Sequence, residues 1–178
     1  MAVLSGYMDA TMENIREAEP EDANAIADIH IASWQFAYRG IMNDELLDSM
    51  DHNKKAAAWS EAIGNLGWSV YVSQDDKRIT GFIHISEYGD KDIAQDRVGE
   101  VASLYILPEL IGFGLGAKLF SEGLSHLAKA GYSQVALWVL QQNARSISFY
   151  QKFGFREDGA SKIHPKTGLM EVRYVRQI

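Results

Sequence analysis

The sequence of 178 residues contains no cysteine. Disulfide bonds, thiolate metal sites and a cysteine nucleophile are therefore excluded. The five histidines are scattered, and no two have the i, i+4 spacing that places two imidazoles on one helical face for a metal. No metal site is expected.

Long apolar runs are also missing. No stretch approaches the ~20 apolar residues that a membrane-spanning helix requires. Residues 1–13 have neither a basic start nor a long apolar core, so they do not form a convincing export signal. We expect residues 1–13 to be a flexible N-terminal arm, and the protein to be cytoplasmic with no membrane partner.

Positive charge is scarce, because 17 Lys and Arg stand against 24 Asp and Glu, a formal net charge of −7. A general nucleic-acid binder needs a basic face to neutralise phosphates, so that class is disfavoured. An acidic chain suits a cationic partner such as an amine or a basic peptide, although many acidic proteins are merely soluble. The length fits one domain with one sizeable core, expected at residues 14–178.

The hydrophobic pattern predicts one strand, three helices, three strands, a helix, a strand, a helix and two strands, in that order. Helical spacing begins after Pro20 and recurs near residue 43 and at 52–65, and alternation marks strands at 68–73, 78–88 and 97–107. Antiparallel strands mixed with two crossover helices predict an α/β or α+β fold in a single domain.

Three glycines fall on alternate positions in LPELIGFGLGAKLF, between a predicted strand and a predicted helix. Glycine inside a helix costs about 1 kcal/mol, but it is useful where a backbone must approach another group. The first N–H groups of a helix have no partner and favour negative charge, so Gly112, Gly114 and Gly116 suit an anion. The alternative is an ordinary helix-start turn whose glycines only permit tight packing.

Two nucleotide-binding motifs fit this segment poorly. A Walker loop ends in Gly-Lys-Ser/Thr, whereas this chain reads GAKL from residue 116. The dinucleotide string G-x-G-x-x-G/A is satisfied from Gly112 to Ala117, but the next strand ends in QQN, without the acid that binds a ribose. A nucleotide-binding domain of another kind is therefore a weak alternative.

Two longer strings resemble the GNAT superfamily of acyl-CoA-dependent N-acyltransferases. SLYILPELIGFGLGAKLF is similar to the acyl-CoA signature, Q/R-x-x-G-x-G/A after a strand and a proline-marked turn. ALWVLQQNARSISFYQKFGF is similar to the last-strand and helix string, N-x-x-[A/S]-x-x-F-Y-x-x-x-G-F. With IREAEPEDANAIADIHIASW, the resemblance covers roughly residues 14–178. It implies a GNAT-like mixed, mostly antiparallel sheet flanked by helices.

The resemblance implies an N-acetyltransferase that moves an acetyl group from acetyl-CoA, the co-substrate, to a primary amine by direct attack. Backbone N–H groups of the glycine segment would hold the pyrophosphate, and the preceding strand would pair with the pantetheine arm. Ile111 stands where the signature has Gln or Arg, which should weaken binding rather than abolish it. The implied cofactor-binding residues are Leu104, Tyr105, Ile106, Ile111, Gly112, Phe113, Gly114, Leu115, Gly116, Ala117, Asn143 and Ser146.

Two side chains are candidates for the proton transfers. In the family, the residue that matches Tyr150 protonates the coenzyme A thiolate, and a phenol near pKa ~10 reaches a thiol near ~8.5 with a small uphill step. Asn143 shares the helical face of Tyr150 and either caps the helix or binds pantetheine. Glu100 is the candidate base, because alternation would place it on the face of Ala102 and Leu104; a surface strand-end charge is its alternative.

The acceptor side is expected in the first helices, where Trp34 and Tyr38 lie at i, i+4. Such a pair binds an alkylammonium by cation–π contact, worth ~0.5–2 kcal/mol, or belongs to the core. The family branch that acetylates ribosomal proteins has a Glu where this chain has Trp138, so its substrate is not carried over.

A small-molecule amine or a peptide amine is therefore expected as the acceptor. Its identity, the use of other acyl groups and a possible homodimer stay open at this point. The competing hypothesis is a non-catalytic acyl-CoA-binding regulatory module with the same fold.

Overall fold

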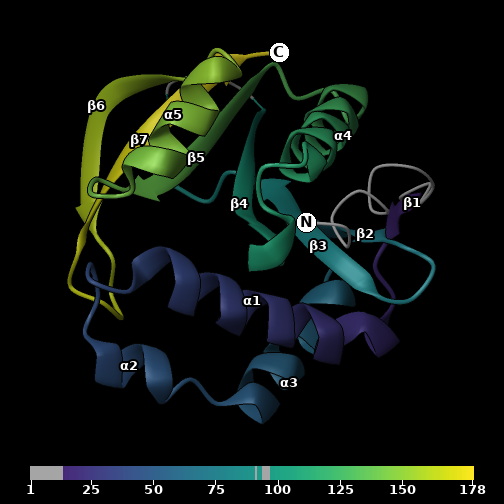
Figure 1. Cartoon of the computed structure of the whole chain (residues 1–178). Helices are drawn as coiled ribbons and strands as arrows, with labels where there is room; N and C mark the ends of the chain where they lie inside the picture. Colours follow the sequence, from purple (N-terminus) through teal and green to yellow (C-terminus); the bar gives the residue numbers. More distant parts are fainter. Residues whose placement is uncertain (1–13, 91, 94–96) are drawn as a thin grey trace.

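The computed structural model describes residues 14–90, 92–93 and 97–178. The expected arm at residues 1–13 lies outside this part of the chain. The elements follow the predicted order of strands and helices (Figure 1): β1 (Asn14–Glu17), η2 (Pro20–Asp22), α1 (Ala23–Tyr38), α2 (Asp44–Asp48), α3 (His52–Ile63), β2 (Trp68–Gln74), β3 (Ile79–Glu87), β4 (Val98–Ile106), η3 (Pro108–Leu110), α4 (Leu115–Lys129), β5 (Gln134–Leu140), α5 (Ala144–Lys152), β6 (Arg156–Ile163) and β7 (Met170–Gln177).

The strands form one sheet in the order β1-β2-β3-β4-β5-β7-β6. Every neighbouring pair is antiparallel except β4 and β5, which are parallel. The parallel pairing covers only Val98 to Glu100 of β4, and beyond it the two strands diverge (Figure 1). The predicted fold class, a mixed and mostly antiparallel sheet flanked by helices, is confirmed.

Helices cover the sheet on both faces, and side-chain alternation along β3 separates the two cores. Ile83 and Ile85 pack in the cluster that contains α4, whereas Phe82 packs with α1 and α3. On the α4 face, Phe120 is fully buried, and its ring lies 5.4 Å from that of Phe149. Burial of such a side chain stabilises the fold by about 1.5–3 kcal/mol. These contacts fix α5 against α4. In the described ranges, no helix is both long and apolar enough to span a bilayer.

A β-bulge interrupts β4. His84 of β3 pairs with Ser103, but Ile85 pairs with Val101, so Ala102 is an extra residue. A bulge reverses the alternation of side chains beyond it. Glu100 therefore shares a sheet face with Ser103 rather than with Leu104, and the expected common face of Glu100 and Leu104 is wrong.

Candidate active site

The glycine segment forms the turn between β4 and α4. Gly112 and Gly114 have φ angles of +100° and +86°, in the left-handed region that L side chains rarely adopt. A Cβ at either position would meet no atom within 4 Å. Backbone conformation, not tight packing, therefore explains these two glycines. Gly114 is the N-cap of α4, so the turn leads directly to the unpaired N–H groups of a helix start.

A cavity of about 760 Å³, here the large cavity, is lined by the second half of β4, this turn, α1 and α5. Its size is typical of a ligand site. Phe113 and Leu115 do not line it, because the Phe113 side chain is exposed and Leu115 is buried in the core. The expected cofactor-binding residues in its wall are Leu104, Tyr105, Ile106, Ile111, Gly112, Gly114, Gly116, Ala117, Asn143 and Ser146.

A second cavity of about 230 Å³, here the small cavity, adjoins the large one. It reaches from α1 across β4 and β5 to the last strand, and its wall includes the predicted pair Trp34 and Tyr38. The residues that line both cavities are Tyr38, Leu104, Tyr105, Asn143, Ser146 and Tyr150. The two cavities therefore meet beside α5 and β4.

Three tyrosines, Tyr38, Tyr105 and Tyr150, stand at this junction. Burial raises the pKa of all three phenols, and each therefore stays protonated at neutral pH. The Tyr105 hydroxyl accepts a hydrogen bond from Trp34 Nε1 at 2.8 Å. Among the residues that the structure describes, none hydrogen-bonds to the Tyr150 hydroxyl. Tyr150 is therefore the phenol whose proton is uncommitted.

Asn143 caps α5. Its Oδ1 accepts a hydrogen bond from the backbone N of Ser146 at 3.1 Å, which is the predicted capping role. The residue is also buried and lines both cavities. The cap uses only the amide oxygen, so the amide NH₂ can still donate to a ligand. The two roles that looked exclusive in the sequence are thus compatible.

The predicted base, Glu100, lines neither cavity. Glu171 of β7, which is not among the predicted site residues, does line the small cavity. Burial raises the pKa of both carboxyl groups. The charge of His164 opposes that shift at Glu171, while the charge of Lys162 opposes it at both. Of these two carboxyl groups, Glu171 is therefore the one in a cavity wall.

Alternation along β7 held a partial signal for Glu171. Val172 and Tyr174 are buried on the α5 face, so Glu171 and Arg173 lie on the other face. The pattern identifies a face, but not the cavity under it. His30, Ser103 and His164, also in the small-cavity wall, had no local signal at all.

The predicted cation–π pair is already in contact with a cation. Lys55 Nζ lies 5.7 Å from the centre of the Trp34 ring, and the Trp34 and Tyr38 rings meet edge to face at 5.3 Å. An acceptor ammonium would therefore share the Trp34 ring with Lys55.

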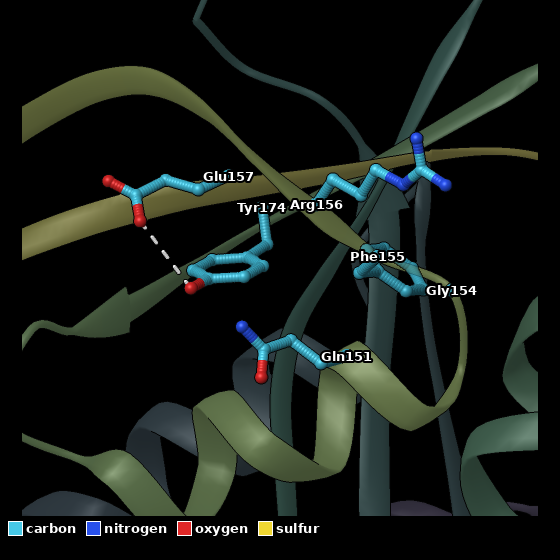
Figure 2. Close-up of a pocket in the computed structure, with 6 residues that line it drawn as sticks. All are labelled: Gln151, Gly154, Phe155, Arg156, Glu157 and Tyr174. Atoms are coloured by element: carbon cyan, nitrogen blue, oxygen red, sulfur yellow. Dashed lines mark hydrogen bonds between the residues drawn. The ribbon is translucent and has the colours of Figure 1, made fainter.

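A separate hollow lies where α5 ends and β6 begins, and shares no residue with either cavity (Figure 2). Glu157 and Gln151 approach the Tyr174 ring from opposite sides, and the Tyr174 hydroxyl donates to Glu157 at 3.5 Å. Neither Tyr150 nor Glu171 lines this hollow.

Sequence comparison adds an independent finding. The model of the Acetyltransferase (GNAT) family matches residues 23–155. The uncharacterized N-acetyltransferase YuaI of Bacillus subtilis (strain 168) is 32% identical over 143 residues, which are 80% of this chain and 79% of that protein. The spermidine N(1)-acetyltransferase of Thermoplasma acidophilum is 28% identical over 160 residues, which are 85% of this chain and 95% of that protein.

Solved structures share the fold. PaiA N-acetyltransferase from Thermoplasma acidophilum, in complex with coenzyme A, superposes with a TM-score of 0.74 at 23% identity, over 93% of this chain and 99% of that chain. YncA from Salmonella typhimurium, with its cofactor acetyl-CoA, superposes with a TM-score of 0.69 at 27% identity, over 93% of each chain.

Proposed function

This chain belongs to the GNAT acetyltransferase family, and from that premise we propose that it transfers an acetyl group from acetyl-CoA to an amine by direct attack. The observation that carries the proposal is the junction of the two cavities. One cavity has the glycine turn in its wall, the other has the carboxylate of Glu171, and Tyr150 lines both. A thioester in the first and an amine in the second would meet beside this phenol.

The large cavity fits acetyl-CoA as co-substrate. Gly112 and Gly114 leave the backbone at the start of α4 open to a pyrophosphate, because neither has a side chain and α4 offers unpaired N–H groups. Among the described strands, none pairs with β4 on its β5 side beyond Glu100, so the β4 backbone can pair there with the pantetheine arm like an added strand. The coenzyme supplies the activated acetyl thioester.

Three groups of the chain serve the reaction. Glu171 accepts a proton from the ammonium form of the acceptor and releases it to solvent. The amine nitrogen then bonds to the carbonyl carbon while the carbon–sulfur bond breaks, and a backbone N–H of residues 104–106 stabilises the developing oxyanion. Tyr150 protonates the leaving thiolate and regains the proton that the amide nitrogen loses. Because the chain has no cysteine, no thiol can carry the acetyl group between steps.

The test measures thiol released from acetyl-CoA with a broad panel of amines. We expect amine-dependent release, and a Tyr150→Phe variant that loses about 10²- to 10⁴-fold in kcat while its Kd for acetyl-CoA stays unchanged. Tyr132→Phe is the matched control, because Tyr132 packs against Arg97 and lines neither cavity. Tight acetyl-CoA binding without release for any amine would indicate the non-catalytic module instead.

A further inference from the structure

His30 and Trp34 line the small cavity, and two side chains of the facing helix α3 pack against them from outside its wall. His30 and Trp34 lie one turn apart on α1, and Lys55 and Trp59 lie one turn apart on α3. Contacts join the pairs, because Trp59 Nε1 donates to His30 Nδ1 at 3.2 Å and Lys55 Nζ lies 5.7 Å from the Trp34 ring centre. These four side chains thus form one contacting group between α1 and α3.

His30 presents a buried donor with nothing to bind. Its Nδ1 accepts from Trp59, so the neutral ring carries its proton on Nε2. Burial, followed by the charges of Lys55 and Lys166, lowers the pKa of His30 to about 3, which keeps the ring neutral. Nε2 is buried and has no hydrogen-bond partner within the described ranges. A buried donor without a partner destabilises the protein, so a ligand atom that accepts this bond is expected here.

Two lysine side chains are near enough for their charges to lower the pKa of His30, Lys55 over the Trp34 ring and Lys166 beyond it. Lys166 belongs to the loop between β6 and β7, which reaches toward the C-terminal end of α1 (Figure 1) and packs there through Leu169. Its backbone N donates to His164 Nδ1, and the His164 ring lies 6.3 Å from that of Trp34. Burial and the charge of Lys166 both lower the pKa of Lys55, so the two ammonium groups are close enough to repel each other.

Neither ammonium group has a carboxylate partner among residues 14–90, 92–93 and 97–178. The chain as a whole has a net charge of −7. The region of Lys55, Lys166 and His30 differs from it, because it combines two positive charges with one N–H group that has no acceptor in the described ranges. An anion bound there would relieve the repulsion and satisfy His30. The neighbouring carboxylate of Glu171 belongs to β7, where it lies with His164 and Lys162.

The small cavity thus has the unpaired N–H of His30 and the carboxylate of Glu171 in its wall, and the charges of Lys55 and Lys166 act on His30 from outside that wall. We propose that the acceptor is an amine that also carries a carboxylate, as an amino acid does. The carboxylate binds His30 Nε2 and is attracted by the charges of the two lysines, and the amine faces Glu171. This inference rests on the proposed function and narrows it to a class of acceptor. A polyamine would bring positive charge to Lys55 and Lys166 and is disfavoured.

The test uses matched acceptors, each amino acid against its own carboxamide, with spermidine as a third arm. Each is assayed with wild type, Lys55→Met, Lys166→Met and the control Lys54→Met, in which an exposed lysine of the same helix is removed. Methionine keeps an apolar stem over Trp34. We expect the acid-to-amide ratio of kcat/KM to fall on the order of tenfold for Lys55→Met and for Lys166→Met, and to stay unchanged for Lys54→Met. The differing basicity of the two amines is the same for every variant, so it cancels when the ratio of a variant is divided by that of wild type.

A second arm measures binding without turnover. Calorimetry in the presence of coenzyme A compares an N-acetyl amino acid with its carboxamide. Tighter binding of the acid, lost in Lys55→Met, supports the inference even if no amine releases thiol, which would overturn only the proposed function. A preference for spermidine or carboxamides that Lys55→Met leaves unchanged would overturn the inference and leave acetyl transfer intact.

Discussion

The large and small cavities meet at Tyr150, but they are built from different parts of the chain. The large cavity takes much of its wall from one continuous stretch, from Leu104 to Ala117, where backbone conformation and free main-chain groups matter most. The small cavity collects side chains from residue 30 to residue 171, carried by α1, β4, β5, the β6–β7 loop and β7. The large cavity thus includes one continuous segment whose backbone conformation is encoded locally. The wall of the small cavity is assembled mainly from side chains that are far apart in sequence.

Under the proposed function, this difference assigns coenzyme binding to backbone groups and acceptor selection to side chains. A coenzyme bound through backbone groups needs only a glycine pattern and a helix start, which many sequences can provide. An acceptor is selected by a few polar side chains in a small space. Changes that affect one cavity and spare the other test this division.

The largest effect is expected for Glu171, the carboxylate in the wall of the small cavity. Glu171→Gln removes the proton acceptor and should lower kcat/KM about 10²- to 10⁴-fold, whereas Glu100→Gln should cost far less, because Glu100 lines neither cavity. Amine-dependent thiol release measures both. Equal losses in the two variants, or a larger loss for Glu100→Gln, would restore Glu100 as the base.

The pH dependence sharpens the same comparison. Because burial raises the pKa of Glu171, the acidic limb of kcat/KM should have its midpoint above the ordinary glutamate value, and activity should rise with pH through it. A raised carboxyl pKa means that the folded protein binds this proton more tightly than the unfolded chain, so ionised Glu171 lowers the free energy of unfolding above that pKa. Glu171→Gln should therefore be at least as stable as wild type at neutral pH, as denaturant unfolding can check, so that lost activity is not lost folding.

The next effect in size concerns the glycine turn. Gly114→Val places a β-branched side chain at φ +86°, with about 1–3 kcal/mol of strain, and should weaken acetyl-CoA binding on the order of tenfold in calorimetry. Gly67→Val, at φ +91° and outside both cavities, imposes similar strain elsewhere. If both variants lose stability but only Gly114→Val loses affinity, the turn is a binding element. Matched losses of affinity would make the turn a stability feature only.

The predictability of the two cavities follows from the same distinction. The order of helices and strands, the glycine turn and the common face of Asn143 and Tyr150 are local periodicities, and the structure has all of them. The expected common face of Glu100 and Leu104 is wrong because one extra residue, Ala102, reverses the strand alternation, and nothing in the local pattern marks a bulge. Glu171 and His164 are brought to the small cavity by strand pairing and a loop, which depend on contacts far apart in sequence.

A smaller effect is expected at Asn143, which stands between the two cavities. Asn143→Ala removes the α5 cap and should lower the free energy of unfolding by about 1 kcal/mol, whereas Asn143→Ser keeps a capping oxygen and should lose less. Both remove the amide NH₂, so acetyl-CoA affinity should fall equally in both. Denaturant unfolding and calorimetry separate the two roles, and an affinity restored by Ser would leave the cap as the only role of Asn143.

The smallest effect is expected at Ile111, where the family signature has Gln or Arg. The Ile111 side chain is half-buried and packs against the α4 core. Ile111→Gln should tighten acetyl-CoA binding by about 2- to 10-fold through one added hydrogen bond, with a small loss of stability from the missing apolar contact. Ile111→Ala loses that contact without gaining an amide, so any gain in affinity should be confined to Gln. Unchanged affinity in Ile111→Gln would mean that the backbone of the turn already satisfies the pyrophosphate, and the large cavity would then depend even more fully on main-chain groups.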